Sequence, residues 1–302
     1  ARELAVLETM NGGKPIKESR DVDLPLAAAH FFYYAGWADK LEYAFPGRTG
    51  RPHGVAAQIV PWNFPLLMLA WKIAPALACG NTVVIKPPPL DPMGIAELAR
   101  VVAAELPPGV VNFVCGSGPE IGEALSESPD VDMISFTGSS LVGRRIEEVA
   151  GRTLKRTLQE LGGKSANIVL DDADLESTVT AGVRNCFTNS GQSCNAPTRM
   201  LVSRKRHDAA VEVAATVANA MKVGDPFADG TMLGPVVSQV QFDKIQRLIE
   251  AGVREGARLA AGGPGRPDGL TRGYFIKPTI FGGVRNDMTI AREEIFGPVL
   301  SI

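Results

Sequence analysis

The chain has 302 residues, 45% of them hydrophobic, and a formal net charge of −2 from 31 basic and 33 acidic residues. This length can bury the cores of two domains, and the composition is that of a globular protein. The charges are interspersed, so we expect neither nucleic acid nor an anionic membrane as a partner. No apolar run is long enough to span a bilayer, and residues 1–20 lack the apolar core of a signal peptide. We therefore expect a cytoplasmic protein.

The cysteine and histidine content gives no indication of a metal site. There are four cysteines and three histidines, without CxxC spacing or the paired histidines of a zinc site. We expect reduced thiols and no bound metal.

The first half of the chain shows repeated strand–helix order. Helices are expected over 2–10 and 24–39, and the stretch 42–53, with its Pro and Gly, is expected to be a hairpin or linker. The strands expected next are 54–60, 82–86, 110–114 and 133–136, and the helices are 64–79, 92–106, 119–126 and 139–150. This order predicts a parallel sheet, and the apolar strand 82–86 fits a sheet covered on both faces. The pattern indicates an α/β, doubly wound nucleotide-binding architecture.

The alternation continues after Glu160. Strands are expected over 165–170 and 199–203, helices over 175–188, 206–221 and 242–255, and Gly- and Pro-rich loops from there to the end. We interpret this as a second α/β domain, with the boundary at Gly162-Gly163, so that the domains are 1–161 and 162–302. A site in the cleft between two such domains is expected.

Three segments carry groups suited to covalent chemistry on a carbonyl carbon. Gly191-Gln192-Ser193-Cys194 ends in a soft nucleophile, Glu160-Leu161-Gly162-Gly163-Lys164 begins with a carboxylate, and Pro61-Trp62-Asn63-Phe64-Pro65 contains an amide. A cysteine thiolate can add to the carbon, an amide N–H can stabilise the oxyanion, and a carboxylate can later activate water.

Each of these residues also has an ordinary structural interpretation. A free cysteine is usually a small buried hydrophobe, which we expect for Cys79, Cys115 and Cys186 in their apolar segments. Cys194 follows a small polar loop that would leave its thiol accessible and surrounded by backbone N–H donors.

An acidic residue at a strand end, such as Glu160, is usually only solvated. The two glycines that follow place it at a turn where backbone can approach a ligand. Asn63 could cap the helix that Pro65 begins, a role compatible with oxyanion donation.

Glycine turns follow two of the expected strands. The segment from Phe136 to Gly143 leads from a strand into a helix, where a helix N-terminus can meet a pyrophosphate. Its Gly-x4-Gly spacing is not the G-x-G-x-x-G fingerprint, and it and Gly116-x-Gly118 could be ordinary tight turns. Lys86 ends a strand, at the edge of the sheet where ligands bind.

With these motifs, the chain closely resembles the NAD(P)-dependent aldehyde dehydrogenase superfamily along nearly all of its length. Further segments that carry the resemblance are 71–77 (WKIAPAL), 107–112 (PPGVVN) and 293–298 (EEIFGP). The resemblance implies an NAD(P)-binding first domain, a catalytic second domain, and oxidation of an aldehyde to a carboxylic acid. It implies a Cys194 thiohemiacetal and then a thioester, which water activated by Glu160 hydrolyses.

The resemblance also assigns roles residue by residue. Cys194 is the nucleophile, Glu160 the general base, Asn63 with the Cys194 backbone N–H the oxyanion hole, and Lys72 an aid to proton movement from Glu160. The residues implied in binding NAD or NADP are Val60, Pro61, Trp62, Lys86, Pro89, Gly116, Phe136, Thr137, Gly138, Ser139, Val142, Leu161, Glu294 and Phe296. The residues expected to line a mostly apolar substrate entrance are Leu67, Met68, Trp71, Phe187, Ser193 and Asn195.

Some features depart from the family pattern. Family members begin earlier and continue past Ile302, so we expect a piece that lacks N- and C-terminal segments, with 42–53 as a shortened oligomerisation hairpin. A homo-oligomer is implied by the family alone. Pro89 stands where many NAD-preferring relatives have an acidic residue, which leaves NAD and NADP both open. The alternatives are a CoA-acylating semialdehyde dehydrogenase, against which Glu160 argues, and a non-catalytic truncated homologue.

Overall fold

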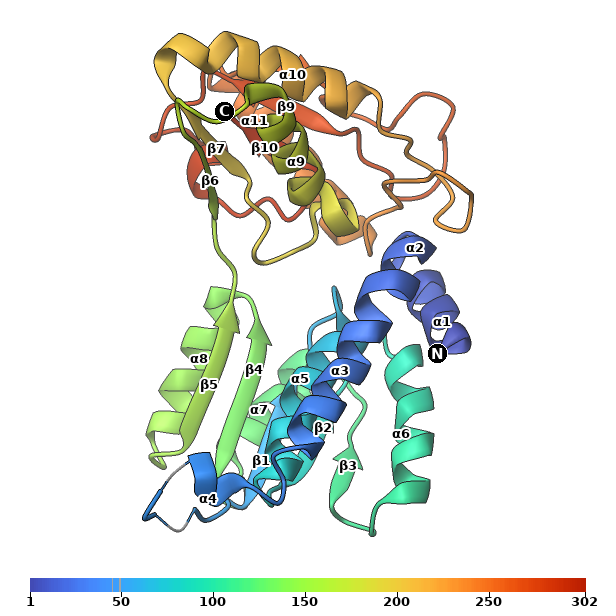
Figure 1. Cartoon of the computed structure of the whole chain (residues 1–302), viewed down its shortest axis with the longest axis vertical. Helices are drawn as coiled ribbons and strands as arrows, with labels where there is room; N and C mark the ends of the chain where they lie inside the picture. The colour runs from blue at the N-terminus through green and yellow to red at the C-terminus, as the bar shows by residue number, and fades with distance from the viewer. Residues whose placement is uncertain (45, 49) are drawn as a thin grey trace. The chain divides into compact units, whose positions relative to one another are not determined.

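A computed structural model describes every residue of the chain except 45 and 49. The chain packs into two compact units (Figure 1): unit 1 holds Ala1–Gly12 and Lys17–Leu161, and unit 2 holds Gly13–Ile16 and Gly162–Ile302. Each unit is built on a five-stranded sheet, and the expected α/β class with a doubly wound parallel sheet is confirmed. Within the described residues, no helix combines the length and the apolar character needed to cross a bilayer.

Unit 1 alternates strands and helices after a helical start. The N-terminal elements are α1 (Arg2–Gly12), α2 (Ile16–Glu18), the π-helix η1 (Ser19–Asp23), α3 (Leu24–Ala35) and α4 (Leu41–Ala44). The strands are β1 (Val55–Ile59), β2 (Thr82–Lys86), β3 (Val111–Phe113), β4 (Met133–Gly138) and β5 (Arg156–Leu161). The helices between them are α5 (Pro65–Ala78), α6 (Met93–Glu105), α7 (Gly118–Glu127) and α8 (Ser140–Gly151).

The sheet of unit 1 is parallel and covered on both faces. Its strand order is β3-β2-β1-β4-β5. Successive residues of β1 enter different cores, because side chains alternate across a strand. Ala56 packs with residues of α5 such as Leu69, whereas Ala57 packs with Ile146 of α8. The strand order reverses between β1 and β4, and ligands of doubly wound sheets bind at the carboxyl ends of the strands at such a switch point.

The N-terminal part differs from expectation in two places. The second helix ends at Ala35 rather than near residue 39, and a turn follows it. The described residues of 42–53 contain the end of α4 and no strand. Residues 45 and 49 of that stretch lie outside the description.

Unit 2 has a mixed sheet in the order β6-β7-β10-β9-β8, in which only the β8–β9 pair is antiparallel. Its strands are β6 (Ala166–Val169), β7 (Arg199–Val202), β8 (Arg258–Ala261), β9 (Thr279–Gly282) and β10 (Val299–Ser301). Its helices are α9 (Leu175–Phe187), η2 (Thr188–Gly191), η3 (Arg204–Arg206), α10 (His207–Asn219), α11 (Gln239–Arg254) and α12 (Thr289–Arg292). Val299 and Leu300, adjacent on the central strand β10, pack into different cores, so this sheet is also covered on both faces.

The prediction of loops from residue 256 to the end was wrong, because β8, β9, α12 and β10 lie there. A second unexpected feature is the short segment Gly13–Ile16, which belongs to unit 2 although the chain on both sides belongs to unit 1. Its Ile16 N–H donates to the carbonyl of Pro226 at 2.9 Å. Unit 2 is therefore built from two separate parts of the chain.

Candidate active site

The connection from β1 to α5 carries Val60, Pro61, Trp62 and Asn63 at the switch point of the unit 1 sheet. Helix α5 begins at Pro65 as expected, but its N-cap is Phe64 and not Asn63. The Asn63 side chain is buried, with 7% of its surface exposed. The cap position therefore falls one residue later than the sequence suggested.

The connection from β4 to α8 uses its serine as a cap. The Ser139 hydroxyl accepts a hydrogen bond from the Val142 N–H at 3.3 Å, which satisfies one of the free N–H groups of the first helical turn. In the preceding strand the Thr137 hydroxyl is buried and has no hydrogen-bond partner among the described residues. The turn thus offers the first N–H groups of α8 and one buried hydroxyl to a ligand.

Lys86 lies at the carboxyl end of β2, where its ammonium donates to the Pro87 carbonyl at 3.0 Å. Burial lowers the pKa of Lys86, and the neighbouring Cys115 thiol opposes this. Cys115 and Cys79 are exposed, so the expectation that they are buried packing residues was wrong, whereas Cys186 is buried as expected. Pro89 is exposed as well.

Gly116 follows β3, where a Cβ atom would come within 2.7 Å of the Ile121 side chain. This close packing gives Gly116 a structural role in the turn.

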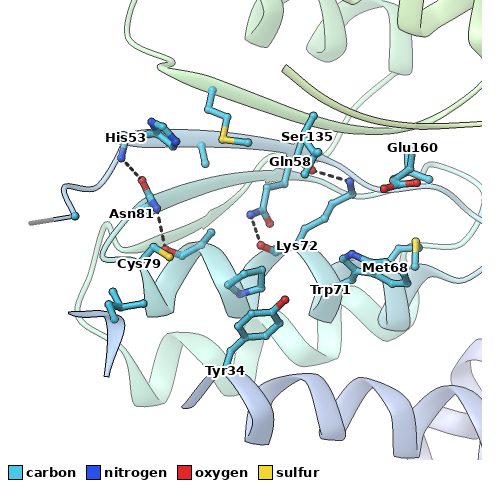
Figure 2. A pocket seen from close by; sticks show the side chains of 18 of the residues that line it. Tyr34, His53, Gln58, Met68, Trp71, Lys72, Cys79, Asn81, Ser135 and Glu160 are labelled. Carbon is cyan, nitrogen blue, oxygen red and sulfur yellow. Dashed lines mark hydrogen bonds between the residues drawn. The ribbon is translucent and has the colours of Figure 1, made fainter. Parts of the chain in front are cut away.

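Glu160 and Lys72 share a cavity in unit 1. Glu160 is exposed and is the second-last residue of β5. It therefore lies in the strand itself and not in a turn. The cavity has a volume of about 560 Å³, and its walls include Met68 and Trp71 of α5 and Thr137 of β4. Figure 2 shows the Lys72 side chain reaching from α5 to the sheet, where its ammonium ends beside the Glu160 carboxylate.

Burial in this cavity destabilises the charged form of Lys72. Burial lowers the pKa of Lys72 to about 8, and the Glu160 carboxylate partly offsets this by favouring the ammonium. The ammonium donates to the Ser135 hydroxyl at 2.8 Å. A lysine with such a pKa can both hold and release a proton near neutral pH, which suits proton transfer.

The loop that leads to Cys194 is buried and internally hydrogen-bonded. The Asn189 side chain donates to the Gln192 carbonyl at 3.3 Å, and the Gln192 side chain donates to the Asn189 carbonyl at 3.1 Å. The Ser190 hydroxyl donates to the Gly234 carbonyl at 2.9 Å. The Gln192 side-chain oxygen also accepts the Val237 N–H at 3.0 Å. The loop is therefore fixed to the neighbouring segment of unit 2, and the half-buried Cys194 follows it.

The backbone of this loop adopts a rare conformation. Asn189, Ser190 and Gly191 have φ of 51°, 55° and 74° in succession. Left-handed backbone is unfavourable for residues with a Cβ, and such strain persists where surrounding contacts enforce it, often at functional sites. At Gly191 a Cβ atom would overlap the Gly297 carbonyl group. The Gly-Gln-Ser-Cys motif thus needs its glycine for close packing against the Glu293–Pro298 motif.

Three of the residues expected at the substrate entrance lie in unit 2, namely Ser193, Asn195 and Phe187, and they have two different environments. The Ser193 hydroxyl donates to the Asn195 side-chain oxygen at 2.6 Å, so these two residues flank Cys194 as a bonded pair. Phe187 is among the largest fully buried side chains of the chain and packs in the core with Val183 and Met200. In unit 2 it therefore serves as a core residue.

Glu294 lies close to the Gly162-Gly163 pair, and Phe296 follows it two residues later. The Glu294 carboxylate accepts the Gly163 N–H at 3.1 Å, and a Cβ atom on Gly162 would overlap that carboxylate. Phe296 has φ of 60°, which is unusual for a bulky residue. The two glycines of the Glu-Leu-Gly-Gly-Lys motif therefore make room for the carboxylate of a second motif.

Two residues of α11 that belong to none of the sequence motifs, Gln241 and Lys244, contact or face this segment. The Gln241 side chain donates to the Phe296 carbonyl at 2.8 Å. Burial lowers the pKa of Lys244, and the Glu294 and Glu293 carboxylates oppose this. Both side chains lie on one face of the helix, three residues apart. Their only signal in the sequence is a polar pair on an otherwise apolar helical face.

The structure thus gathers the predicted residues into two groups. Unit 1 brings Lys72, Glu160, Met68, Trp71 and Thr137 around one cavity. Leu67 is half-buried on α5 and is not part of the cavity wall. Unit 2 carries Cys194 and its loop, together with the segment of Glu294 and Phe296.

Comparison with known proteins gives one family. The model of the aldehyde dehydrogenase family matches residues 1–302, the whole chain. The chain is 46% identical to human retinal dehydrogenase 2 over 310 residues, which cover 99% of this chain and 59% of that protein. It is also 46% identical over 306 residues to 3-succinoylsemialdehyde-pyridine dehydrogenase from a Pseudomonas species, with 64% of that protein covered.

The same similarity is found among solved structures. A structure of a C291A mutant of aldehyde dehydrogenase C from Pseudomonas syringae, in complex with NAD+ and octanal, superimposes with a TM-score of 0.94 at 46% identity. The superposition covers 99% of this chain and 63% of that one. The chain therefore spans about six tenths of the length of the relatives it matches.

Proposed function

Since the chain belongs to the aldehyde dehydrogenase family, we propose that the protein oxidises an aldehyde to a carboxylic acid, with Cys194 as nucleophile and Glu160 as general base. The observation that carries this proposal is the strained, buried loop Asn189–Gly191 that precedes the half-buried Cys194. Cys186, by contrast, is fully buried, and burial raises the pKa of its thiol to about 12, so it would remain an unreactive thiol.

The proposed residues divide the chemistry into two stages. The Cys194 thiolate forms a bond to the aldehyde carbon, and the Asn63 amide and the Cys194 N–H donate to the resulting oxyanion. Loss of hydride from that carbon leaves an acyl group on sulfur. Glu160 then takes a proton from water as the water oxygen attacks the thioester, and cleavage of the C–S bond returns the thiolate and releases the acid.

The residues of unit 1 fit a nicotinamide dinucleotide. A bound oxidised cofactor would supply the hydride acceptor. The buried Thr137 hydroxyl without a partner and the first turn of α8 offer donors at the switch point of the sheet. Lys86 would bind the adenine ribose, with Gly116 and Ser139 in the adenosine and pyrophosphate region.

The other cofactor residues carry over from the family resemblance. Glu294 and Phe296 would hold the nicotinamide ribose and ring. The backbone and side chains proposed to complete this site are Val60, Pro61, Trp62, Pro89, Phe136, Gly138, Val142 and Leu161. Because Pro89 provides no carboxylate to repel a 2′-phosphate, we propose that both NAD and NADP are used.

The proposed substrate is an aldehyde with an apolar chain. Met68 and Trp71 of α5 form apolar walls of the cavity in which Glu160 lies. Leu67, Ser193 and Asn195 are proposed to complete the entrance, and a related structure contains octanal. A cytoplasmic location and a homo-oligomer are proposed from the free thiols and from the family, respectively.

The test is made on the complete protein. Cys194→Ala should abolish the formation of reduced cofactor from an aldehyde while cofactor affinity is kept. Glu160→Gln should give a burst of reduced cofactor of about one per active site and then slow turnover, because only the second stage needs the base. Glu148→Gln, an exposed carboxylate of α8, is the matched control and should behave as wild type.

Two results would contradict the proposal. Aldehyde oxidation that survives Cys194→Ala would exclude this residue as nucleophile. Full turnover of Glu160→Gln on addition of CoA would show that CoA, and not water, receives the acyl group.

A further inference from the structure

We propose that Ser135 is a positioning residue that holds the Lys72 ammonium beside Glu160 for proton transfer, an inference that rests on the proposed function of Glu160. The Ser135 hydroxyl accepts the hydrogen bond of the ammonium at 2.8 Å. Both residues are buried, each with 6% of its surface exposed. A hydrogen bond to a buried charge contributes more than one at the surface, because water does not compete for either partner.

The register of the sheet places this hydroxyl next to the general base. Thr137 of β4 pairs with Glu160 of β5, and Ser135 lies two residues before Thr137. Residues two apart in a strand have side chains on the same face. Ser135 and Glu160 therefore face the same cavity from adjacent strands, and both line it. Figure 2 shows the end of the Lys72 side chain between them.

A second residue holds the other end of the same lysine. The Gln58 side chain of β1 donates to the Lys72 backbone carbonyl at 2.9 Å. Gln58 is the cross-strand partner of Ser135 in the β1–β4 register. Two paired residues of adjacent strands thus hold the backbone and the ammonium of Lys72, and this arrangement leaves its side chain little freedom to turn away from Glu160.

A serine suits this position because its hydroxyl can act in both protonation states of the lysine. It accepts from the ammonium, and it can donate to the neutral amine. When Glu160 has taken a proton from water, the neutral Lys72 amine can receive it, which returns Glu160 to the carboxylate. Ser135 keeps Lys72 in place through this exchange.

The other titratable and charged groups around the cavity come from three places. They are Tyr34 on α3, Cys79 next to the end of α5, and Arg51 and His53 before β1. Among the described residues, only Glu160 changes the pKa of Lys72 through its charge. A substitution at Ser135 leaves all of these charges unchanged, so a change in Lys72 titration reports the loss of the hydroxyl at this buried position.

The experiment compares three variants of the complete protein. Ser135→Ala removes the acceptor, and Ser135→Thr keeps a hydroxyl on a residue suited to a strand. Ser126→Ala is the matched control, because Ser126 is also buried in unit 1 but donates to the Gly122 carbonyl at 2.7 Å. The first readout is the midpoint pH for modification of Lys72 by a trace amount of an amine reagent, measured on the Lys72 peptide by mass spectrometry.

The hydroxyl bonds the ammonium more strongly than the neutral amine, so its loss should lower the pKa of Lys72 below the value of about 8. The expected decrease in the midpoint for Ser135→Ala is about one pH unit. Ser135→Thr should restore the wild-type midpoint, and Ser126→Ala should leave it unchanged. The second readout is steady-state turnover, whose pH midpoint should move down together with the labelling midpoint.

Three results would overturn the assignment: a wild-type labelling midpoint in Ser135→Ala, an equal change in Ser126→Ala, or a turnover midpoint that stays in place while the labelling midpoint moves. A complete wild-type protein that forms no reduced cofactor from any aldehyde would contradict the proposed function instead. In that case the labelling midpoint alone would still show whether Ser135 holds the Lys72 ammonium.

Discussion

Substitution of Gly191 by alanine should be among the most damaging single-methyl changes in unit 2. Gly191 has φ of 74°, and left-handed backbone costs a residue with a Cβ about 1–2 kcal/mol. The added Cβ would also overlap the Gly297 carbonyl and come within 2.7 Å of the Pro298 nitrogen. Backbone cannot move aside as a flexible side chain can, and overpacking typically costs a further ~1–3 kcal/mol. The sum is a loss of about 3 kcal/mol in the free energy of unfolding.

Gly283→Ala isolates the first of these two costs. Gly283 has φ of 65°, and no atom lies within 4 Å of the position of an added Cβ. The melting temperature of the complete protein, measured by differential scanning calorimetry, should therefore fall at least about twice as far for Gly191→Ala as for Gly283→Ala. The rate of Cys194 alkylation should change only in Gly191→Ala. Equal melting temperatures for the two variants would refute the argument that Gly191 is needed for close packing.

Three further predictions concern other parts of the molecule. Asn63→Ala should lower the oxidation rate about 10²–10³-fold, the usual loss for one oxyanion donor; a lower melting temperature at an unchanged rate would make Asn63 purely structural. Pro89→Glu should shift use from NADP toward NAD, because a carboxylate repels a 2′-phosphate; kinetic constants for both cofactors that show a strong, unchanged NAD preference would contradict this. Burial lowers the pKa of Lys164 from 10.5 to about 8. Between these two pH values the folded state therefore binds fewer protons than the unfolded state, so the free energy of unfolding rises with pH. Lys164→Met should accordingly raise the melting temperature at pH 7, with an advantage that shrinks as pH rises through this range; a constant difference at all pH values would disagree.

The strands of unit 1 were predictable where both faces of the sheet are covered. The expected strand 82–86 has the bounds of β2, because its run of apolar and β-branched residues can fit only a buried strand. Strand β5 (Arg156–Leu161) was predicted only through a strand end at Glu160, without bounds. It lies at an edge of the sheet and exposes polar residues, so its hydrophobic pattern is weak.

The end of unit 2 was missed for a different reason. Strands β8, β9 and β10 have only three or four residues each and lie among Gly- and Pro-rich loops. A window that short shows no periodicity, and these strands are stabilised by pairing with residues far away in the sequence. The three-dimensional sheet, and not the local pattern, determines them.

Residues of the candidate site could be predicted from the sequence where their side chains carry unusual chemistry. Ordinary residues that support those side chains could not be predicted. Cys194 and Glu160 stand in motifs with a reactive side chain next to glycines. Ser135 and Gln58 stand in apolar strands, where a small or a polar residue is usually a packing detail. Cys79 and Cys115 were placed in the interior because of their apolar neighbours. They lie just past the end of a helix and of a strand, where exposure depends on tertiary structure.

Because unit 2 includes the early segment Gly13–Ile16, the residues of the two units become available for folding at different times during synthesis. During synthesis, every residue of unit 1 in this sequence precedes Gly162, so unit 1 can begin to fold before unit 2. Unit 2 must wait for Pro226 and the residues around it before the early segment finds its hydrogen-bond partner. Closing so long a loop carries an entropic cost that slows folding. A fragment that starts at Gly162 would therefore leave the Pro226 carbonyl and the surface against Gly13 uncovered, and isolating unit 2 as a folded piece requires this short segment to be supplied as well.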